Sequence, residues 1–312
     1  MSRVATATAA AAAVLTACLL TVFGVGDEPN ALPNWQALVL GLVQGLTELL
    51  PISSSGHLIL VPWLGEWRFL EQNDEFNQTF DVALHLGTLV AVVAYFRREI
   101  VELLAAWFGS VARRRIRTPA ERVAWIVVVA TIPAALVGGL GEQLIADHLG
   151  EPWQIAILLA VFALVLWAAD RMPEEREAAD LSLWAGFGIG CAQALALMPG
   201  VSRSGVTISA ARFLRLGRDQ AARLSFLMLA PITLGAVVFK GVDDVLLGTL
   251  PPGWEGPFVV GMLAAAGSGL VAISVLLGYV RRHDYTIFVL YRLFTAAAVM
   301  LLIMTGARNA SF

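Results

Sequence analysis

The chain has 312 residues, of which 58% are hydrophobic and 14% are charged, and its formal net charge is −3. Soluble domains carry about 25% charged residues, so this composition indicates an all-α integral membrane protein and argues against a soluble or nucleic-acid-binding protein. Cys18 and Cys191 both lie in apolar stretches, where we expect membrane-buried thiols rather than a disulfide or a metal site.

The first segment, residues 1–34, combines an apolar stretch at 5–25 with a polar linker. The apolar stretch follows a single Arg3 and lacks the strongly basic start of a typical signal peptide. It predicts an extra N-terminal membrane helix, with an uncleaved signal-like segment as the alternative.

The next stretch, about 35–65, is apolar but carries an unusual number of polar side chains. Gln44 and Glu48 lie four residues apart and therefore share one face of a helix. Pro51 ends that helix, and the serines after it are typical of a turn that caps a second helix starting near His57. Both helices are too short to cross a bilayer. The stretch therefore predicts a re-entrant helix pair.

Further apolar stretches are long enough to cross a membrane. They lie at about 80–96, 123–141, 153–170, 224–240, 257–279 and 286–306. The segments between them alternate between Arg-rich and Arg-poor, and the Arg-rich ones are 97–122, 171–182, 212–223 and 281–285. Because cytoplasmic loops carry the excess of Lys and Arg, we expect the Arg-rich segments to be cytoplasmic loops.

The polar stretch recurs later in the chain. Residues 190–205 align with 41–56 without gaps, and six of the sixteen positions are identical. The second copy predicts another re-entrant pair at about 183–211, which enters from the cytoplasmic side, whereas the first enters from outside. The chain thus divides into inverted-topology repeats at 35–182 and 183–312, each a re-entrant pair plus three crossings. Broken helices at equivalent places in two halves indicate a binding site at the repeat interface.

Several ionisable residues fall inside these apolar stretches. A carboxylate in the hydrocarbon costs about 2.5–3.5 kcal/mol, so Glu48 indicates a functional site rather than a satisfied structural group. Arg203 lies among hydroxyls at a helix start, where guanidinium and backbone N–H groups suit a phosphate. A structural arginine there would need a carboxylate that its own half does not supply. His85 could line the site or be structural, and we expect Arg292 near the membrane edge, paired or reaching the interface.

Three motifs together carry a family resemblance: Gln44-x-x-x-Glu48, Pro51-x-Ser-Ser-Ser-Gly-His57 and Pro199-Gly-Val-Ser-Arg-Ser-Gly-Val-Thr207. The chain resembles undecaprenyl-diphosphatases of the bacitracin-resistance type, which are marked by (Glu/Gln)-x-x-x-Glu and Pro-Gly-x-Ser-Arg-Ser-x-x-Thr. The resemblance covers about 35–306. The apolar start of the chain is a departure from the family pattern.

The resemblance implies hydrolysis of undecaprenyl diphosphate to the monophosphate and phosphate, which recycles a lipid carrier for peptidoglycan synthesis and confers bacitracin resistance. It implies catalytic roles for Glu48, His57, Ser54 and Arg203. The expected phosphate-binding residues are Ser53, Ser55, Ser202, Ser204, Thr207 and Arg203. It also implies a divalent cation, Mg²⁺ or Ca²⁺, held by Glu48 and Gln44. The nucleophile stays open between a serine, His57 and water.

The expected partners are a prenyl diphosphate lipid and membrane lipids, with no nucleic acid, and a homodimer is left open. We expect a multi-pass protein of the bacterial inner membrane with a site open to the outer face. A polyprenyl-phosphate transporter or flippase is the alternative function, because inverted repeats with broken helices are typical of transporters. A shared site further predicts that His57 and Arg203 converge to within about 15 Å.

Overall fold

The computed structural model describes residues 9, 11–14, 16, 32–67, 69–70, 73–241 and 253–311; the side chains of 74–75, 142–147 and 239–241 are not part of the description. Most of the predicted N-terminal helix at 5–25 and Cys18 lie outside these residues. Within them the chain is helical and has no strand, apart from one isolated backbone bridge between Arg176 and Leu216. The prediction of an all-α polytopic membrane protein is confirmed.

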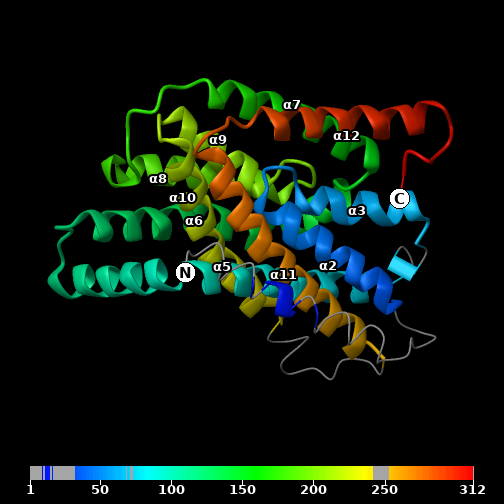
Figure 1. The fold of residues 1–312 in the computed structure, drawn as a ribbon, viewed down its shortest axis with the longest axis horizontal. Coiled ribbons are helices and arrows are strands. Elements are labelled where there is room, and N and C mark those ends of the chain that lie inside the picture. Colours follow the sequence, from blue (N-terminus) through cyan, green and yellow to red (C-terminus); the bar gives the residue numbers. More distant parts are fainter. Residues whose placement is uncertain are drawn as a thin grey trace.

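Each half has the same order of elements, a pair of short helices followed by three long ones (Figure 1). The first half holds α2 (Asn34–Leu49), α3 (Ser54–Gly65), α5 (Asp74–Arg113), α6 (Pro119–His148) and α7 (Pro152–Asp170). The second half holds α8 (Leu183–Ala194), α9 (Arg203–Phe213), α10 (Arg218–Gly241), α11 (Glu255–Val280) and α12 (Thr286–Met304). Two short 3₁₀ turns, η1 (Ala178–Asp180) and η2 (Leu195–Leu197), lie beside α8. The repeat predicts this order, while the opposite orientation of the halves across a membrane stays a prediction.

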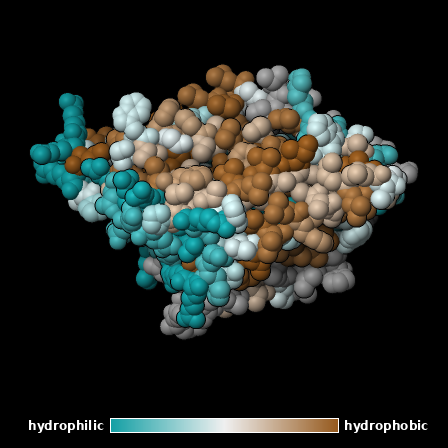
Figure 2. All heavy atoms as spheres, turned by 90° about the horizontal axis from the view of Figure 1, so that it is seen from above, coloured by the Kyte–Doolittle hydropathy of each residue, from teal (hydrophilic) through white to brown (hydrophobic). Residues whose placement is uncertain are grey.

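Within the described residues, six helices are long and apolar enough to cross a membrane. They are Phe76–Arg113, Pro119–Gly141, Pro152–Asp170, Arg218–Val238, Glu255–Val280 and Thr286–Met304. Apolar side chains are also widespread on the surface, where Leu140 and Phe294 are 88% and 73% exposed. Figure 2 shows apolar residues across the middle of one face and hydrophilic ones gathered toward one end. Such a surface suits lipid rather than water.

The α5–α6 hairpin differs from the sequence prediction. A crossing was expected at 80–96 and a loop at 97–122, but α5 continues to Arg113, with one non-helical residue at Phe96 (φ −97°, ψ 16°). The hairpin projects from the rest of the molecule (Figure 1). Arg113 pairs with Glu121 at 2.5 Å, so charges that the sequence assigned to a loop join two helix ends. Loss of apolar character marks the end of the membrane stretch and does not mark the end of the helix.

Small residues bring the short helices close to the long ones. The helix α2 packs along α11, and the equivalent α8 packs along α6. A Cβ on Gly41 would lie 2.3 Å from the carbonyl oxygen of Gly261, and one on Gly190 would lie 2.5 Å from that of Ala130. Only glycine permits this approach, as in other helix pairs within membranes. Both polar turns are thereby held inside the bundle.

Candidate active site

The two polar turns have the same backbone conformation. Ser53 precedes α3 with φ 76° and ψ 97°, and Ser202 precedes α9 with φ 75° and ψ 112°. Each serine hydroxyl accepts a hydrogen bond from the glycine three residues later, Gly56 or Gly205. A positive φ in a residue other than glycine costs about 1–3 kcal/mol and is concentrated at functional sites. The repeated motif therefore encodes the same strained turn twice.

The two turns also bind each other. The amide of Gly200 donates to Ser53 Oγ at 3.1 Å, and the hydroxyl of Ser204 donates to the carbonyl of Leu50 at 2.9 Å. Residues about 150 positions apart thus form one polar assembly in the interior. The sequence prediction of a shared location for the two turns is confirmed.

Arg292 of α12 fixes this assembly and is fully buried. Its guanidinium donates to the carbonyl of Pro51 in the first turn (3.3 Å) and to those of Gly200 and Val201 in the second (3.0 and 3.1 Å). A fourth bond reaches the carbonyl of Leu159 in α7 at 3.2 Å. The expectation that the Arg292 side chain reaches the membrane interface was wrong, because it is buried in the protein and serves carbonyls that the turns leave without a donor. A charge within an apolar stretch was the signal available in the sequence.

Glu48 joins the two halves through its carboxylate. Its Oε1 accepts a hydrogen bond from Arg203 Nε at 3.1 Å, and its Oε2 accepts one from the hydroxyl of Ser54. The Glu48 side chain is 6% exposed and that of Arg203 is 13% exposed. The carboxylate that Arg203 lacks in its own half thus comes from the other half. Because the pair is largely buried, its electrostatic interaction is screened less by water than that of a surface pair.

The three guanidinium nitrogens of Arg203 have different surroundings. Besides the bond to Glu48, Nη1 donates to the carbonyl of Ser225 at 3.0 Å. The buried Nη2 has no hydrogen-bond partner. A buried donor without an acceptor is destabilising, so the free Nη2 indicates a place for an anionic oxygen.

His57 lies in the assembly but does not bond to Glu48. Its Nδ1 lies 2.6 Å from the carbonyl oxygen of Ser53, which can only accept, so Nδ1 carries the proton. Its Nε2 lies 2.7 Å from the hydroxyl of Tyr291, which donates to it when the ring is neutral. The two rings also stack, with centroids 5.6 Å apart. Tyr291 was missed, because one tyrosine in an apolar helix gives no signal of a distant partner.

His85 is the imidazole that faces Glu48. Its Nε2 lies 3.8 Å from Glu48 Oε2, and its Nδ1 lies 2.7 Å from the carbonyl oxygen of Asp81. His85 thus lies beside Glu48, and whether it serves the site or the structure stays a prediction. One turn before Glu48, the side chain of Gln44 is fully buried, and neither its oxygen nor its nitrogen has a hydrogen-bond partner.

The remaining predicted hydroxyls surround these groups. Ser202 Oγ lies 3.3 Å from Ser204 Oγ, and Thr207 Oγ1 lies 2.7 Å from Ser225 Oγ. Ser225 is a further residue that the sequence did not single out. Ser55 is partly exposed in the first turn of α3. In the described part of the chain, no group of three or more His, Cys, Asp or Glu side chains has the arrangement of a metal site.

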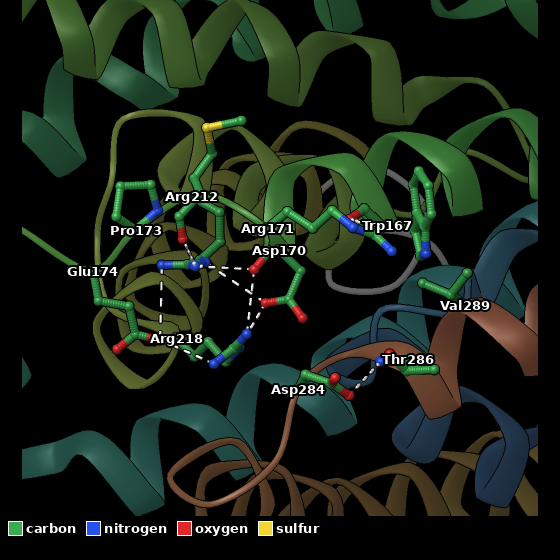
Figure 3. Close-up of a pocket in the computed structure, with 11 residues that line it drawn as sticks. Trp167, Asp170, Arg171, Pro173, Glu174, Arg212, Arg218, Asp284, Thr286 and Val289 are labelled. Carbon is green, nitrogen blue, oxygen red and sulfur yellow. Dashed lines mark hydrogen bonds and ion pairs between the residues drawn. The ribbon is translucent and has the colours of Figure 1, made fainter.

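A cavity of about 320 Å³ lies away from these turns, where α7, α9, α10 and α12 meet (Figure 3). Its lining includes three arginines and three acids: Arg171, Arg212, Arg218, Asp170, Glu174 and Asp284. Arg218 bonds to Asp170 at 2.6 Å and to Glu174 at 3.2 Å. The fully buried Arg212 donates to the carbonyls of Leu216 and Met172. Because its charges balance, and Arg212 and Arg218 pair with Asp170 and Glu174, this cavity suits a structural clamp better than a diphosphate site.

Neighbouring groups complete the clamp. The amide of Tyr285 donates to Asp170 Oδ2 at 2.9 Å, and burial raises the pKa of the Tyr285 hydroxyl, which donates to the carbonyl of Arg218. A hydrogen bond from the backbone N–H of Thr286 lowers the pKa of Asp284. The clamp therefore holds the start of α12 against the end of α7.

Comparisons with known proteins give one family. The model of the bacitracin resistance protein BacA family matches residues 37–298. A protein of Pelobacter propionicus named undecaprenyl-diphosphatase is 44% identical over 272 residues, which cover 86% of this chain and 97% of that protein. Proteins of the same name from Moorella thermoacetica and Thermomicrobium roseum are 45% and 43% identical, and they cover 85% and 88% of this chain and 96% and 99% of their own lengths. Because the family model matches residues 37–298, which hold both motif-bearing turns, this chain belongs to the bacitracin resistance protein BacA family.

Proposed function

We propose that this chain is an integral membrane phosphatase that hydrolyses undecaprenyl diphosphate to undecaprenyl phosphate and inorganic phosphate. The observation that carries the proposal is the buried cluster of Glu48, Ser54 and Arg203, which combines an acceptor, a nucleophile and a cation. The similar proteins of Pelobacter propionicus and Moorella thermoacetica are named undecaprenyl-diphosphatase, which supports it. A transporter needs a phosphate clamp but gains nothing from a serine bonded to a carboxylate, so the cluster favours hydrolysis.

Arg203 is the phosphate-binding residue in this proposal. Its unpartnered Nη2 supplies a charge-assisted hydrogen bond to an oxygen of the terminal phosphate. The bonds from Nε and Nη1 to Glu48 and Ser225 hold the guanidinium plane in place before the substrate arrives. Preorganised cations of this kind stabilise the charge of a phosphoryl-transfer transition state.

Ser54 is the nucleophile and Glu48 is its base. Ser54 Oγ attacks the terminal phosphorus, and the bond from that phosphorus to the bridging oxygen breaks. Glu48 accepts the serine proton and passes it to the departing undecaprenyl phosphate. Glu48 then takes a proton from a water whose oxygen attacks the phosphoserine, and it returns that proton to Ser54 as inorganic phosphate leaves.

A divalent cation is part of the proposal, and the residues present fit one. Glu48 offers a carboxylate, and Gln44 on the same face of α2 offers a buried amide oxygen without a partner. Carboxylate and amide oxygens are ligands of Mg²⁺ and Ca²⁺. When bound, the cation would neutralise charge on the diphosphate.

We place the site in the inner membrane and open to the outer face. The support is the distribution of arginine, because the segments that flank the first re-entrant pair are Arg-poor. A charged headgroup does not cross the hydrocarbon cheaply, so the lipid hydrolysed is the pool already outside. With Cys18 and Cys191 replaced, a cysteine at the partly exposed Ser55 should react with an impermeant thiol reagent on intact cells. Reaction only in inverted vesicles would overturn the orientation.

The decisive experiment is phosphate release from a long-chain prenyl diphosphate by the purified protein. We expect release by the wild-type chain and its loss in Ser54→Ala and Glu48→Gln. Brief reaction with substrate labelled in the terminal phosphate should leave label on the protein, and Ser54→Ala should abolish it. Ser110→Ala, at the distant α5–α6 hairpin, is the matched control. No release by folded wild-type protein would overturn the proposed function, and release without labelling would exclude the serine nucleophile.

A further inference from the structure

His85 has the surroundings of a metal ligand. Its Nδ1–H donates to the carbonyl of Asp81 at 2.7 Å, which leaves the lone pair on Nε2 in the neutral ring. That nitrogen faces Glu48 Oε2 at 3.8 Å, which is longer than a hydrogen bond. Metal-binding histidines donate their second ring N–H to a carbonyl or carboxylate in this way, which fixes the ring and directs the lone pair at the ion.

The separation of the two donor atoms also fits a shared ion. Ligand bonds of about 2.0–2.4 Å place two donors of one cation roughly 3–4 Å apart, depending on the angle between them. The 3.8 Å between His85 Nε2 and Glu48 Oε2 lies in this range. Gln44, with its unpartnered buried amide, lies on the same face of α2 as Glu48.

The charges nearby limit which ion would be held. Glu48 is the one carboxylate of the set, and Arg203 already bonds to its Oε1. A cation therefore reaches the Oε2 side, where His85 and Ser54 are the neighbours. Calcium sites are built from several oxygen ligands, whereas imidazole suits transition metals. One shared carboxylate plus an imidazole is a poor calcium site and a better one for a borderline cation.

We propose that His85 Nε2 binds the divalent cation together with Glu48 and the Gln44 amide oxygen, and that this chain therefore prefers a transition-metal ion such as Mn²⁺ over Ca²⁺. The proposal rests on the cation of the proposed function and adds to it a ligand from α5 and a metal class. It assigns His85 to the metal and leaves His57 with Tyr291.

The test is to measure Mn²⁺ binding to the purified full-length protein. The electron paramagnetic resonance signal of the free ion reports how much Mn²⁺ stays unbound. His85→Gln should weaken Mn²⁺ binding at least tenfold and should change Ca²⁺ binding, measured by competition, less than about threefold. His283→Gln is the matched control: His283 makes the same bond to a carbonyl four residues earlier, Tyr279, but it is exposed in a turn. It should bind Mn²⁺ like the wild type.

A second measurement separates ligation from folding. Pulsed electron paramagnetic resonance detects a histidine nitrogen bound to Mn²⁺, and this coupling should be present in the wild type and in His283→Gln. It should vanish in His85→Gln and His85→Asn, with melting temperatures measured for each. Coupling that persists without His85, or no Mn²⁺ binding at all, would overturn the proposal. Because binding is measured without substrate, a loss of Mn²⁺ in His85→Gln would stand even if phosphate release failed.

Discussion

The two polar turns share a backbone and differ in their side chains. Ser53 and Ser202 have φ values of 76° and 75°, and both cap the helix that follows. Yet the position of Glu48 is Leu197 in the second turn, and that of His57 is Val206. Ser54 is replaced by Arg203. The conformation is thus retained in both copies, while the carboxylate and the Ser54 hydroxyl lie in one and the guanidinium lies in the other.

This difference teaches why the site needs both halves. Within one turn, the serine hydroxyl and the guanidinium would need the same position, since Ser54 and Arg203 are equivalent residues. Placed on separate turns, they approach across the repeat interface, and Arg203 Nε reaches Glu48 at 3.1 Å. Breaking one turn at a time should therefore separate chemistry from binding.

The largest effect should come from the arginine of the second turn. Arg203→Ala should lower kcat/KM about 10³–10⁵-fold, the range for arginines that stabilise phosphoryl transfer. Arg203→Lys should be nearly as damaging, because one ammonium cannot replace three nitrogens that reach Glu48, Ser225 and the substrate. Phosphate release by folded protein is the measurement, and the exposed Arg215→Lys is the control. A Lys variant that kept most of its activity would show that a point charge suffices.

The serines of the first turn should separate chemistry from turn stability. Ser54→Ala should lower kcat at least about 10³-fold, as loss of a nucleophile does, with little change in melting temperature. Ser53→Ala and its equivalent Ser202→Ala should each lower stability by about 1 kcal/mol through loss of a helix cap. Both variants should retain a larger fraction of the wild-type kcat than Ser54→Ala does. Equal kcat values in all three variants would contradict the assignment of Ser54.

The two equivalent glutamines should respond with opposite signs. Gln193 donates to the carbonyl of Ala130 at 3.2 Å, so Gln193→Leu should lower stability by about 1 kcal/mol. Gln44 is buried without a partner, so Gln44→Leu should leave stability unchanged or raise it. Gln44→Leu should raise the cation concentration that gives half-maximal activity about tenfold or more, whereas Gln193→Leu should leave it unchanged. Thermal unfolding and cation titration check this, and the same sign of stability change in both would refute it.

The smallest effect should come from Tyr291. Tyr291→Phe removes the donor to His57 Nε2 but keeps the stacked ring. A neutral hydrogen bond contributes about 0.5–1.5 kcal/mol, so kcat should fall about two- to tenfold if His57 orientation matters to the chemistry. The equivalent of His57 is Val206, and its helix keeps the same cap without any such bond. An unchanged kcat would show that the hydrogen bond between Tyr291 and His57 has only a structural role.

Most of the fold could be predicted from the sequence. The re-entrant pairs expected at 35–65 and 183–211 correspond to α2–α3 and α8–α9, because Pro51 and Pro199 interrupt apolar sequence within one residue of the same place in the two copies. The six crossings follow from apolar length. The end of α5 could not be predicted in this way, since a helix can continue in water after its apolar sequence stops.

The site was predicted in outline and not in its contacts. The repeat brought Glu48 and Arg203 together because it placed their turns at one interface. The sequence could not tell which imidazole faces the carboxylate, since His57 and His85 both lie in apolar helices. Only the packing of α5 against α2 directs His85 there.

Arg292 has a consequence for biogenesis. It lies on α12, which follows every other described helix in the chain, yet it is hydrogen bonded to the carbonyls of both turns. During synthesis, the four buried carbonyls that it serves have no such donor until α12 has left the ribosome and inserted. The two turns therefore cannot gain this set of hydrogen bonds before α12 is in place. A nascent chain arrested before α12 would expose an unfinished polar interior to membrane quality-control proteases.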